Sequence, residues 1–271
     1  MTGPNTPAVG PRIATAGALP AELDRALADR FELVPEADDI EAPVVLIGRI
    51  ASWTEDDLGK LADRAAGRVI IPALTRRFQP GAQRLAGSVV GGDLGLPWAV
   101  QSELVVRGTD ADQPSLQDLL AESVDAVRTI LGLEVRSVAA RTSAPLDAKA
   151  GAVTATLIFD HEIGASITVG LIDGPAVGSP DDRIRVLGNE GVLLADLGRP
   201  AVLINGGVES RRYGPEALDG LLDQVGAAAA GRPARLPSLD DARAIVRVLA
   251  AVRRSISESS VIVLADSTNA P

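Results

Sequence analysis

Three carboxylates follow one another at helical spacing in the middle of the chain. Asp118, Glu122 and Asp125 lie within the segment 115–132, whose apolar residues recur with the period of an amphipathic helix. This spacing brings all three side chains to one face. Neighbouring carboxylates resist ionising together, so Asp118 and Glu122 are suited to general acid–base chemistry. The same spacing is also typical of a solvated stripe on a helix surface.

Few other residues offer catalytic chemistry. The chain has no cysteine and one histidine, His161, which excludes disulfides and thiolate zinc sites and leaves no histidine cluster for a metal. Lys60 and Lys149 are the two lysines among 26 basic residues. We therefore expect no metal site, and a mechanism that needs a lysine has two candidates.

Charge and hydropathy exclude two classes of partner. The net charge is −10 and the isoelectric point is near 4.7, so a basic face for nucleic acid is not expected. No apolar run is long enough for a membrane span, and the first residues lack the order of a signal peptide, so we expect a cytoplasmic protein.

Residues 11–80 alternate short apolar runs with helical segments, which predicts a βαβ layer with a parallel sheet. From residue 81 to 265 most strand-like runs are separated by Gly, Asp and Pro turns, which predicts a mostly antiparallel sheet with helices on one face. Residues 1–10 and 266–271 are interpreted as tails. The expected helices lie at 21–30, 54–66, 80–92, 115–132, 215–230 and 239–258.

Six strings in this order resemble the Gfo/Idh/MocA oxidoreductases, which act on sugars and cyclitols with a tightly held nicotinamide cofactor. Together they span roughly residues 43–264. The resemblance implies a shortened Rossmann-like layer followed by an open, mostly antiparallel sheet whose last helices pack back toward the first domain. The strings are TEDDLGKLADRAAGRVIIPALTRRFQP, GGDLG, DLLAESVDAVRTILGLEVRSVAA, LIFDHEIGASITVGL, RIRVLGNEGVLLAD and RPARLPSLDDARAIVRVLAAVRRS.

The chain departs from this family at the cofactor loop. Where the family has GxGxxG, residues 15–20 have TAGALP, which keeps Gly17 alone and places Thr15 and Pro20 in space that phosphates need. Glu36 or Asp38 would face the ribose. The front layer is also short: 67 residues run from Arg12 to Phe78, against about 100 or more for a doubly wound domain. We therefore expect no nicotinamide cofactor; NAD(P) is expected if the family activity persists.

The resemblance also places the site residues. Gly48, Arg49 and Ile50 replace the family's Glu-Lys-Pro, so Arg49 stands for the lysine. Asp118, Glu122 and Asp125 match a family helix with Asp, His and Asp. A glutamate thus replaces the histidine that moves the hydroxyl proton. Asp118 and Glu122 are the expected acid–base pair, with Arg49 as an electrophilic or anion-binding group.

The sequence also predicts the surroundings of five further residues. Arg77 and Asp125 are predicted to contact a ligand, with a structural ion pair as the alternative for Arg77. Trp53 is predicted to face the cleft and Trp98 to fill the core. His161 is predicted to lie exposed in a hairpin turn.

Three functions remain open: a non-catalytic or ligand-binding subunit for a sugar-like ligand, a cofactor-independent acid–base enzyme, and a divergent NAD(P)-dependent dehydrogenase. We also expect a homo-oligomer, or a hetero-oligomer with a related active subunit. The expected interface is the open sheet face, because rows such as Ile167, Val169 and Leu171 would leave it apolar.

Overall fold

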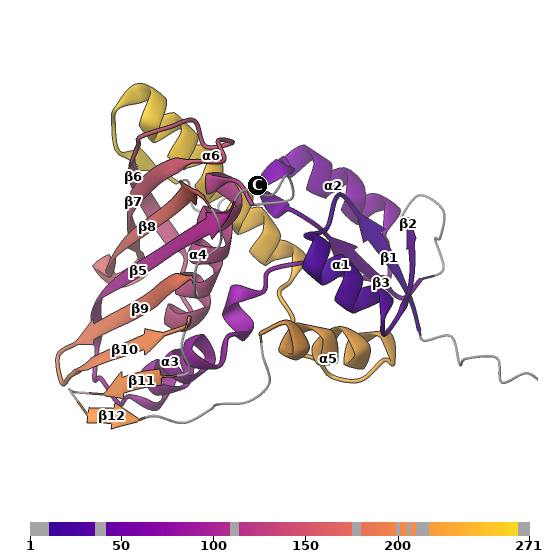
Figure 1. Cartoon of the computed structure of the whole chain (residues 1–271), viewed down its shortest axis with the longest axis horizontal. Helices are drawn as coiled ribbons and strands as arrows, with labels where there is room; N and C mark the ends of the chain where they lie inside the picture. Colours follow the sequence, from indigo (N-terminus) through magenta and orange to yellow (C-terminus); the bar gives the residue numbers. More distant parts are fainter. Residues whose placement is uncertain are drawn as a thin grey trace, which may run out of the picture.

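The computed structural model contains two sheets that lie side by side with helices between them (Figure 1). In the part of the chain that the structure describes, one sheet has four strands and the other nine. The structure describes residues 11–35, 42–108, 114–174, 180–198, 201–204, 207–209 and 217–264.

The first sheet is parallel throughout and has the strand order β2-β1-β3-β4. The order reverses between β1 and β3, and ligands of open parallel sheets bind outside the strand ends at such a point. Two helices, α1 and α2, connect strands of this sheet. Their bounds are β1 Arg12–Ala16, α1 Ala21–Ala28, β2 Glu32–Pro35, β3 Val44–Ile47, α2 Glu55–Arg64 and β4 Val69–Pro72.

This sheet is shorter than the six-stranded doubly wound pattern. Eight residues, 36–43, connect β2 to β3, and 36–41 lie outside the described residues together with the candidate ribose acids Glu36 and Asp38. The shortened Rossmann-like layer expected from the sequence is confirmed.

The second sheet has the order β12-β11-β10-β9-β5-β8-β7-β6-β13. Its neighbouring strands pair antiparallel except β5 with β8, which confirms the mostly antiparallel sheet. Its strands are β5 Pro97–Gly108, β6 Val135–Thr142, β7 Gly151–Phe159, β8 Gly164–Asp173, β9 Asp181–Gly188, β10 Val192–Asp196, β11 Ala201–Ile204, β12 Gly207–Glu209 and β13 Ile262–Val263.

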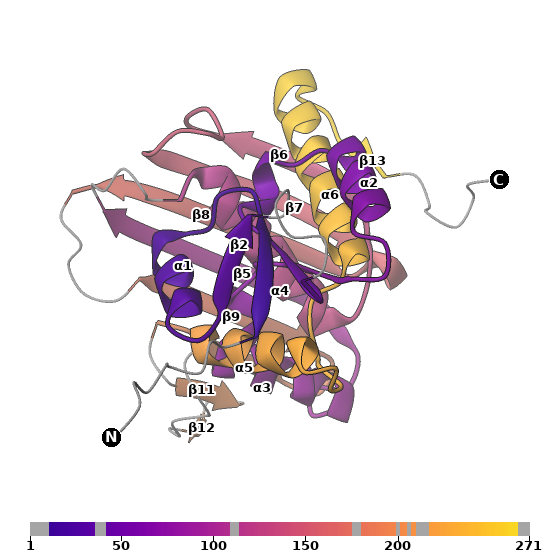
Figure 2. The same ribbon diagram turned by 90° about the vertical axis from the view of Figure 1, so that its right-hand side faces the viewer.

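Helices α3 (Pro80–Gly91), α4 (Leu116–Leu131) and α6 (Leu239–Glu258) cover one face of this sheet (Figure 1). Helix α4 contacts β5, β7 and β8 of the large sheet, and on its other side the turns that follow β3 and β4. Figure 2 shows the first sheet in front of the large one. Ser115 and Asp118 form a capping box at the first turn of α4, and Gly132 ends it in the left-handed conformation. Because other elements pack on both sides of α4, most of its residues are buried.

Helix α5 (Ala217–Ala229) packs on the first sheet instead. Leu221, Leu222 and Val225 are buried in the same apolar cluster as Ile13 and Leu27. A segment late in the sequence thus completes the core of the first sheet.

The expected apolar open face is wrong. Ile167, Val169 and Leu171 are buried under the helices, so the face that they form is the covered one. Strand residues alternate between faces, and the open face of β8 carries Ser166 and Thr168. The sequence shows two alternating sets, but not which set the helices cover.

Among the described residues, three short 3₁₀ turns join these elements: η1 (Ile50–Ser52), η2 (Arg76–Phe78) and η3 (Asp160–Glu162). The turn η1 follows β3 and η2 follows β4. They place Ile50 and Arg76 at the carboxyl ends of these strands. Across the described residues, no helix combines the length and apolarity needed to cross a bilayer.

Candidate functional site

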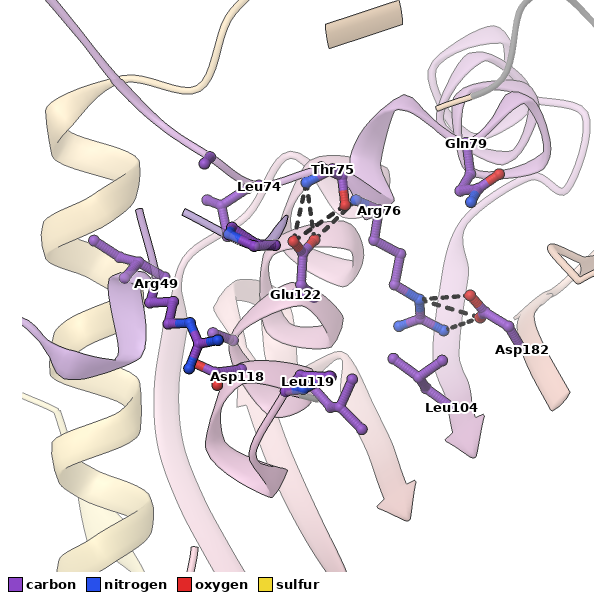
Figure 3. A pocket seen from close by; sticks show the side chains of 15 residues that line it. Arg49, Leu74, Thr75, Arg76, Gln79, Leu104, Asp118, Leu119, Glu122 and Asp182 are labelled. Carbon is purple, nitrogen blue, oxygen red and sulfur yellow. Dashed lines mark hydrogen bonds and ion pairs between the residues drawn. The ribbon is translucent and has the colours of Figure 1, made fainter. Parts of the chain in front are cut away.

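A cavity of about 260 Å³ lies where the strand ends of the first sheet meet α4 (Figure 3). The loops after β1, β3 and β4 form one side, and α4 with β5 and β9 forms the other. It is lined by Pro20, Arg49, Ile50, Ala73, Leu74, Thr75, Arg76, Gln79, Leu104, Pro114, Asp118, Leu119, Ala121, Glu122 and Asp182. All three residues predicted as catalytic are among them.

Arg49 enters the cavity from the end of β3. Its backbone is left-handed, with φ of 39°, a conformation that a non-glycine residue rarely adopts. The turn η1 that follows is fixed by Gln117 and Arg253, whose side chains both donate to the Ala51 carbonyl. Figure 3 shows the Arg49 guanidinium directed toward Asp118.

Asp118 has a structural task besides lining the cavity. Its Oδ2 accepts hydrogen bonds of 2.9 Å from both the backbone N–H and the hydroxyl of Ser115. These bonds close the capping box, so one carboxylate oxygen is already occupied.

Glu122 connects α4 to the loop after β4. Its carboxylate accepts hydrogen bonds from the Thr75 N–H at 3.0 Å, the Thr75 hydroxyl at 3.2 Å and the Arg76 N–H at 2.8 Å. Burial raises the pKa of Glu122 to about 7, although these donors favour its charged form. Near neutral pH this carboxyl is therefore poised between its two protonation states.

Arg76 and Asp182 form a buried ion pair that sequence reasoning missed. Arg76 Nη2 lies 2.5 Å from Asp182 Oδ1, and Arg76 Nη1 donates to the Ser102 hydroxyl at 2.9 Å. Burial raises the pKa of Asp182, against the lowering effect of Arg76. The adjacent arginines 76 and 77 were the available signal, but only the turn η2 decides which of them lines the cavity.

Arg77 and Asp125 lie outside the lining of the cavity. Arg77 Nε donates to Asp125 Oδ2 at 2.7 Å, and burial raises the pKa of Asp125 against the lowering effect of Arg77. Asp241 at the start of α6 lies 3.6 Å from Arg77 and 3.1 Å from Arg128. Arg77 thus forms the structural ion pair that was the alternative prediction, and neither Arg77 nor Asp125 lines the cavity where a ligand contact was predicted.

Trp53 closes the crevice at the switch point. Its Nε1 donates to the Gly48 carbonyl at 3.1 Å, and a Cβ added at Gly17 would lie 3.2 Å from that nitrogen. A Cβ added at Gly48 would lie 2.2 Å from the Ala18 carbonyl oxygen, so the loops after β1 and β3 are in direct backbone contact. Trp53 therefore lies at the predicted cleft, where its ring packs against Gly17 and Gly48, and it is not part of the lining of the cavity.

The other loop residues differ from expectation. The Thr15 hydroxyl donates to the Val34 carbonyl on β2 at 3.4 Å, so it faces the neighbouring strand and not the phosphate position. Pro20 stands before the first residue of α1 and lines the cavity. Gly17 has φ of 77°, which requires its small size.

In doubly wound sheets a dinucleotide's pyrophosphate lies beside the loop after the first strand. Here the Trp53 ring and the backbone contact between Ala18 and Gly48 fill the space beside Gly17 in that loop. The Thr15 side chain faces β2 instead.

The remaining candidates lie elsewhere. His161 is exposed in the turn η3 between β7 and β8, as predicted. Trp98, predicted to fill the core, is 62% exposed. Lys60 pairs with Asp56 on the surface of α2. Within the described part of the chain, no group of three or more potential metal ligands occurs.

No family model and no curated protein match the sequence. Solved structures do match the fold. An oxidoreductase from Thermotoga maritima has a TM-score of 0.73 at 12% identity, covering 93% of this chain and 100% of that one. An aldose-aldose oxidoreductase from Caulobacter crescentus complexed with glycerol has 0.70 at 16%, covering 94% and 99%.

An oxidoreductase from Agrobacterium radiobacter in complex with NAD⁺, L-tartaric acid and magnesium has a TM-score of 0.71 at 14% identity, covering 93% of this chain and 98% of that one. These similarities agree with the order of elements and with the two sheets described above. The chain therefore has the fold of the Gfo/Idh/MocA-type oxidoreductases.

Proposed function

We propose that this protein binds a small ligand in the cavity beside α4 and does not use a nicotinamide nucleotide. The observation that carries the proposal is the position of Trp53, whose indole lies in the crevice that a dinucleotide needs. The cavity lies next to this crevice and is lined by Glu122, Arg49 and Asp118.

The closed crevice is held by several contacts. The Gly48 N–H donates to the Ala16 carbonyl at 2.9 Å, which extends the pairing of β1 and β3 to their last residues. Opening a path for a pyrophosphate would require the loops to separate and the Trp53 hydrogen bond to break. Nucleotide binding would have to supply the free energy of that change, so we expect it to be weak.

The test uses the two tryptophans as reporters. In the variant Trp98→Phe, Trp53 is the one remaining tryptophan and reports on the crevice alone. Titration with NADH or NADPH is expected to give no saturable quenching below the millimolar range. A micromolar constant would overturn the proposal and support the third function, a divergent NAD(P)-dependent dehydrogenase. Calorimetric titration of wild-type protein with the same nucleotides serves as the control.

A second candidate function is acid–base catalysis without a cofactor. It is favoured by the pKa of Glu122, which burial raises to about 7 at the wall of the cavity. To act as a base, Glu122 would exchange the bond from the Thr75 hydroxyl, at 3.2 Å, for one from a substrate. Arg49 and Asp118 are the charged groups placed near the substrate in this function.

Hydrogen exchange of an enolisable ketone tests this second function. A base that removes the proton next to the carbonyl lets deuterium enter from D₂O when the enolate is protonated again. Wild-type protein is expected to accelerate the exchange in cyclohexanone, and Glu122→Gln to abolish the acceleration. His161→Ala is the matched control and should keep it. Exchange at the buffer rate with wild-type protein would reject acid–base catalysis and leave ligand binding.

We also propose that the protein assembles through the open face of the large sheet, with itself or with a related active subunit. Half-buried apolar residues form one row across this face by strand register. They are Ile158, Ala99, Leu187 and Val192. This row supports the proposal in place of the buried residues that the sequence first suggested.

A further inference from the structure

We propose that the cavity takes a compact, largely apolar ring bearing one or two oxygen groups, such as a cyclic ketone or alcohol, and rejects polyhydroxylated sugars and cyclitols. This inference rests on the proposed function, because it names the ligand of the same cavity. It follows from the apolar wall of the cavity and from the hydrogen-bond donors and acceptors of the lining residues that other residues do not already occupy.

The wall of the cavity is mostly apolar. Leu74 from the loop after β4, Leu104 from β5 and Leu119 from α4 converge on it, with Ile50 from η1. All four side chains are at most 6% exposed, so they are held in place by the core behind them. A ligand that fills the cavity must cover this surface with carbon atoms to gain from burial.

The polar lining residues are largely bonded to one another. Arg76 is neutralised by Asp182 and also donates to Ser102. The carboxylate of Glu122 accepts from two backbone N–H groups and one hydroxyl. Asp118 closes the capping box of α4. Apart from Oδ1 of Asp118, these groups have little hydrogen-bonding capacity left for a ligand.

Gln79 differs from them. Within the part of the chain that the structure describes, its side-chain amide makes no hydrogen bond, although it lines the cavity. Figure 3 shows it on the opposite side from Arg49. An amide can donate to or accept from one ligand oxygen, and the Arg49 guanidinium can donate to a second.

These capacities set the ligand class. A hydroxyl that enters the cavity without a partner loses its bonds to water, which weakens binding roughly tenfold. A ring with five or six hydroxyls leaves several of them unpaired here, whereas a ring with one or two oxygens leaves none. The volume agrees: cavities of roughly 150 Å³ admit benzene, and this cavity of about 260 Å³ has room for a substituted six-membered ring.

The experiment compares two six-carbon rings, cyclohexanone and myo-inositol, by ligand-observed and protein-observed NMR titration of wild-type protein. Cyclohexanone is expected to bind saturably and at least tenfold more tightly than myo-inositol. Affinity in the millimolar range is expected for so few atoms, so titration extends to about 50 mM. Equal or tighter binding of myo-inositol, or no saturation by cyclohexanone, would overturn the inference. NADH binding in the micromolar range would overturn the proposed function instead.

Two neighbouring strand residues supply the matched variants. Leu104 faces the cavity, while Val105 is the next residue of β5 and points to the open face of the sheet. Leu104→Thr is expected to weaken cyclohexanone binding at least fivefold, and Val105→Thr to leave it within twofold. Should Leu104→Thr fail to fold, Leu119→Gln on α4 takes its place with the same expectation. Equal effects of the cavity variant and Val105→Thr would contradict the assigned site.

Discussion

The indole of Trp53 donates a 3.1 Å hydrogen bond to the carbonyl of Gly48, and this bond joins the residue after η1 to the end of β3. The ring fills the space beside Gly17, at the point where the strand order of the parallel sheet reverses. The crevice that serves as a ligand site in open parallel sheets is here part of the protein's packing. The chain's own cavity lies next to it, against α4.

Replacing Trp53 with alanine should destabilise the protein by about 2–3 kcal/mol, because a half-buried ring and its hydrogen bond are lost. Urea unfolding followed by circular dichroism measures the change. Trp98→Ala is the control: this residue is 62% exposed, and its loss should cost less than about 0.5 kcal/mol. Equal losses in the two variants would show that Trp53 does not hold the crevice closed.

Glu122 predicts an unusual pH dependence of stability. Its folded pKa of about 7 lies above the ordinary value of 4.5, so folding favours the protonated form. The stabilisation is complete below pH 4.5 and is lost as the pH rises toward 7, by on the order of 2–3 kcal/mol. Glu122→Gln stays neutral, and the difference in unfolding free energy between it and wild type should shift by this amount from pH 4.5 to 8. A constant difference would contradict the raised pKa.

Arg77 should affect stability and not ligand binding. Arg77→Met leaves Asp125 charged and buried without its partner, which typically costs about 3–5 kcal/mol. The double variant Arg77→Met/Asp125→Leu should recover part of this loss, because it removes the unpaired charge. Cyclohexanone affinity of the folded double variant should stay within twofold of wild type. A tenfold loss of affinity would instead place Arg77 in the ligand site.

The open sheet face predicts an oligomer. Light scattering at micromolar concentration should give at least twice the chain mass of 27.9 kDa. Ile158→Arg places a charge in the half-buried apolar row of this face and should shift the protein toward the monomer. Val90→Arg, at an 88% exposed position of α3, is the control and should not. A monomeric wild-type protein would refute self-association and leave the heteromeric alternative.

Local patterns in the sequence determined the elements and the fold class. The helix at 239–258 was predicted with the bounds that the structure shows, because Ser238 and Asp241 form a capping box that depends on adjacent residues. The alternating runs after residue 100 likewise predicted the strands of the large sheet. The alternation depends on consecutive residues alone, so it can be recognised without knowledge of the fold.

The tertiary structure alone decided which face and which partner each side chain has. Alternation along β8 defines two faces, but only the packing of the helices shows that the face with Ile167 and Val169 is the covered one. Glu122 meets Thr75 across 47 residues of sequence, and Arg76 meets Asp182 across 106. Burial and hydrogen bonds of this kind depend on elements brought together only by packing. For that reason the sequence placed Glu122 among the candidates, while its protonation and its cavity follow from the fold.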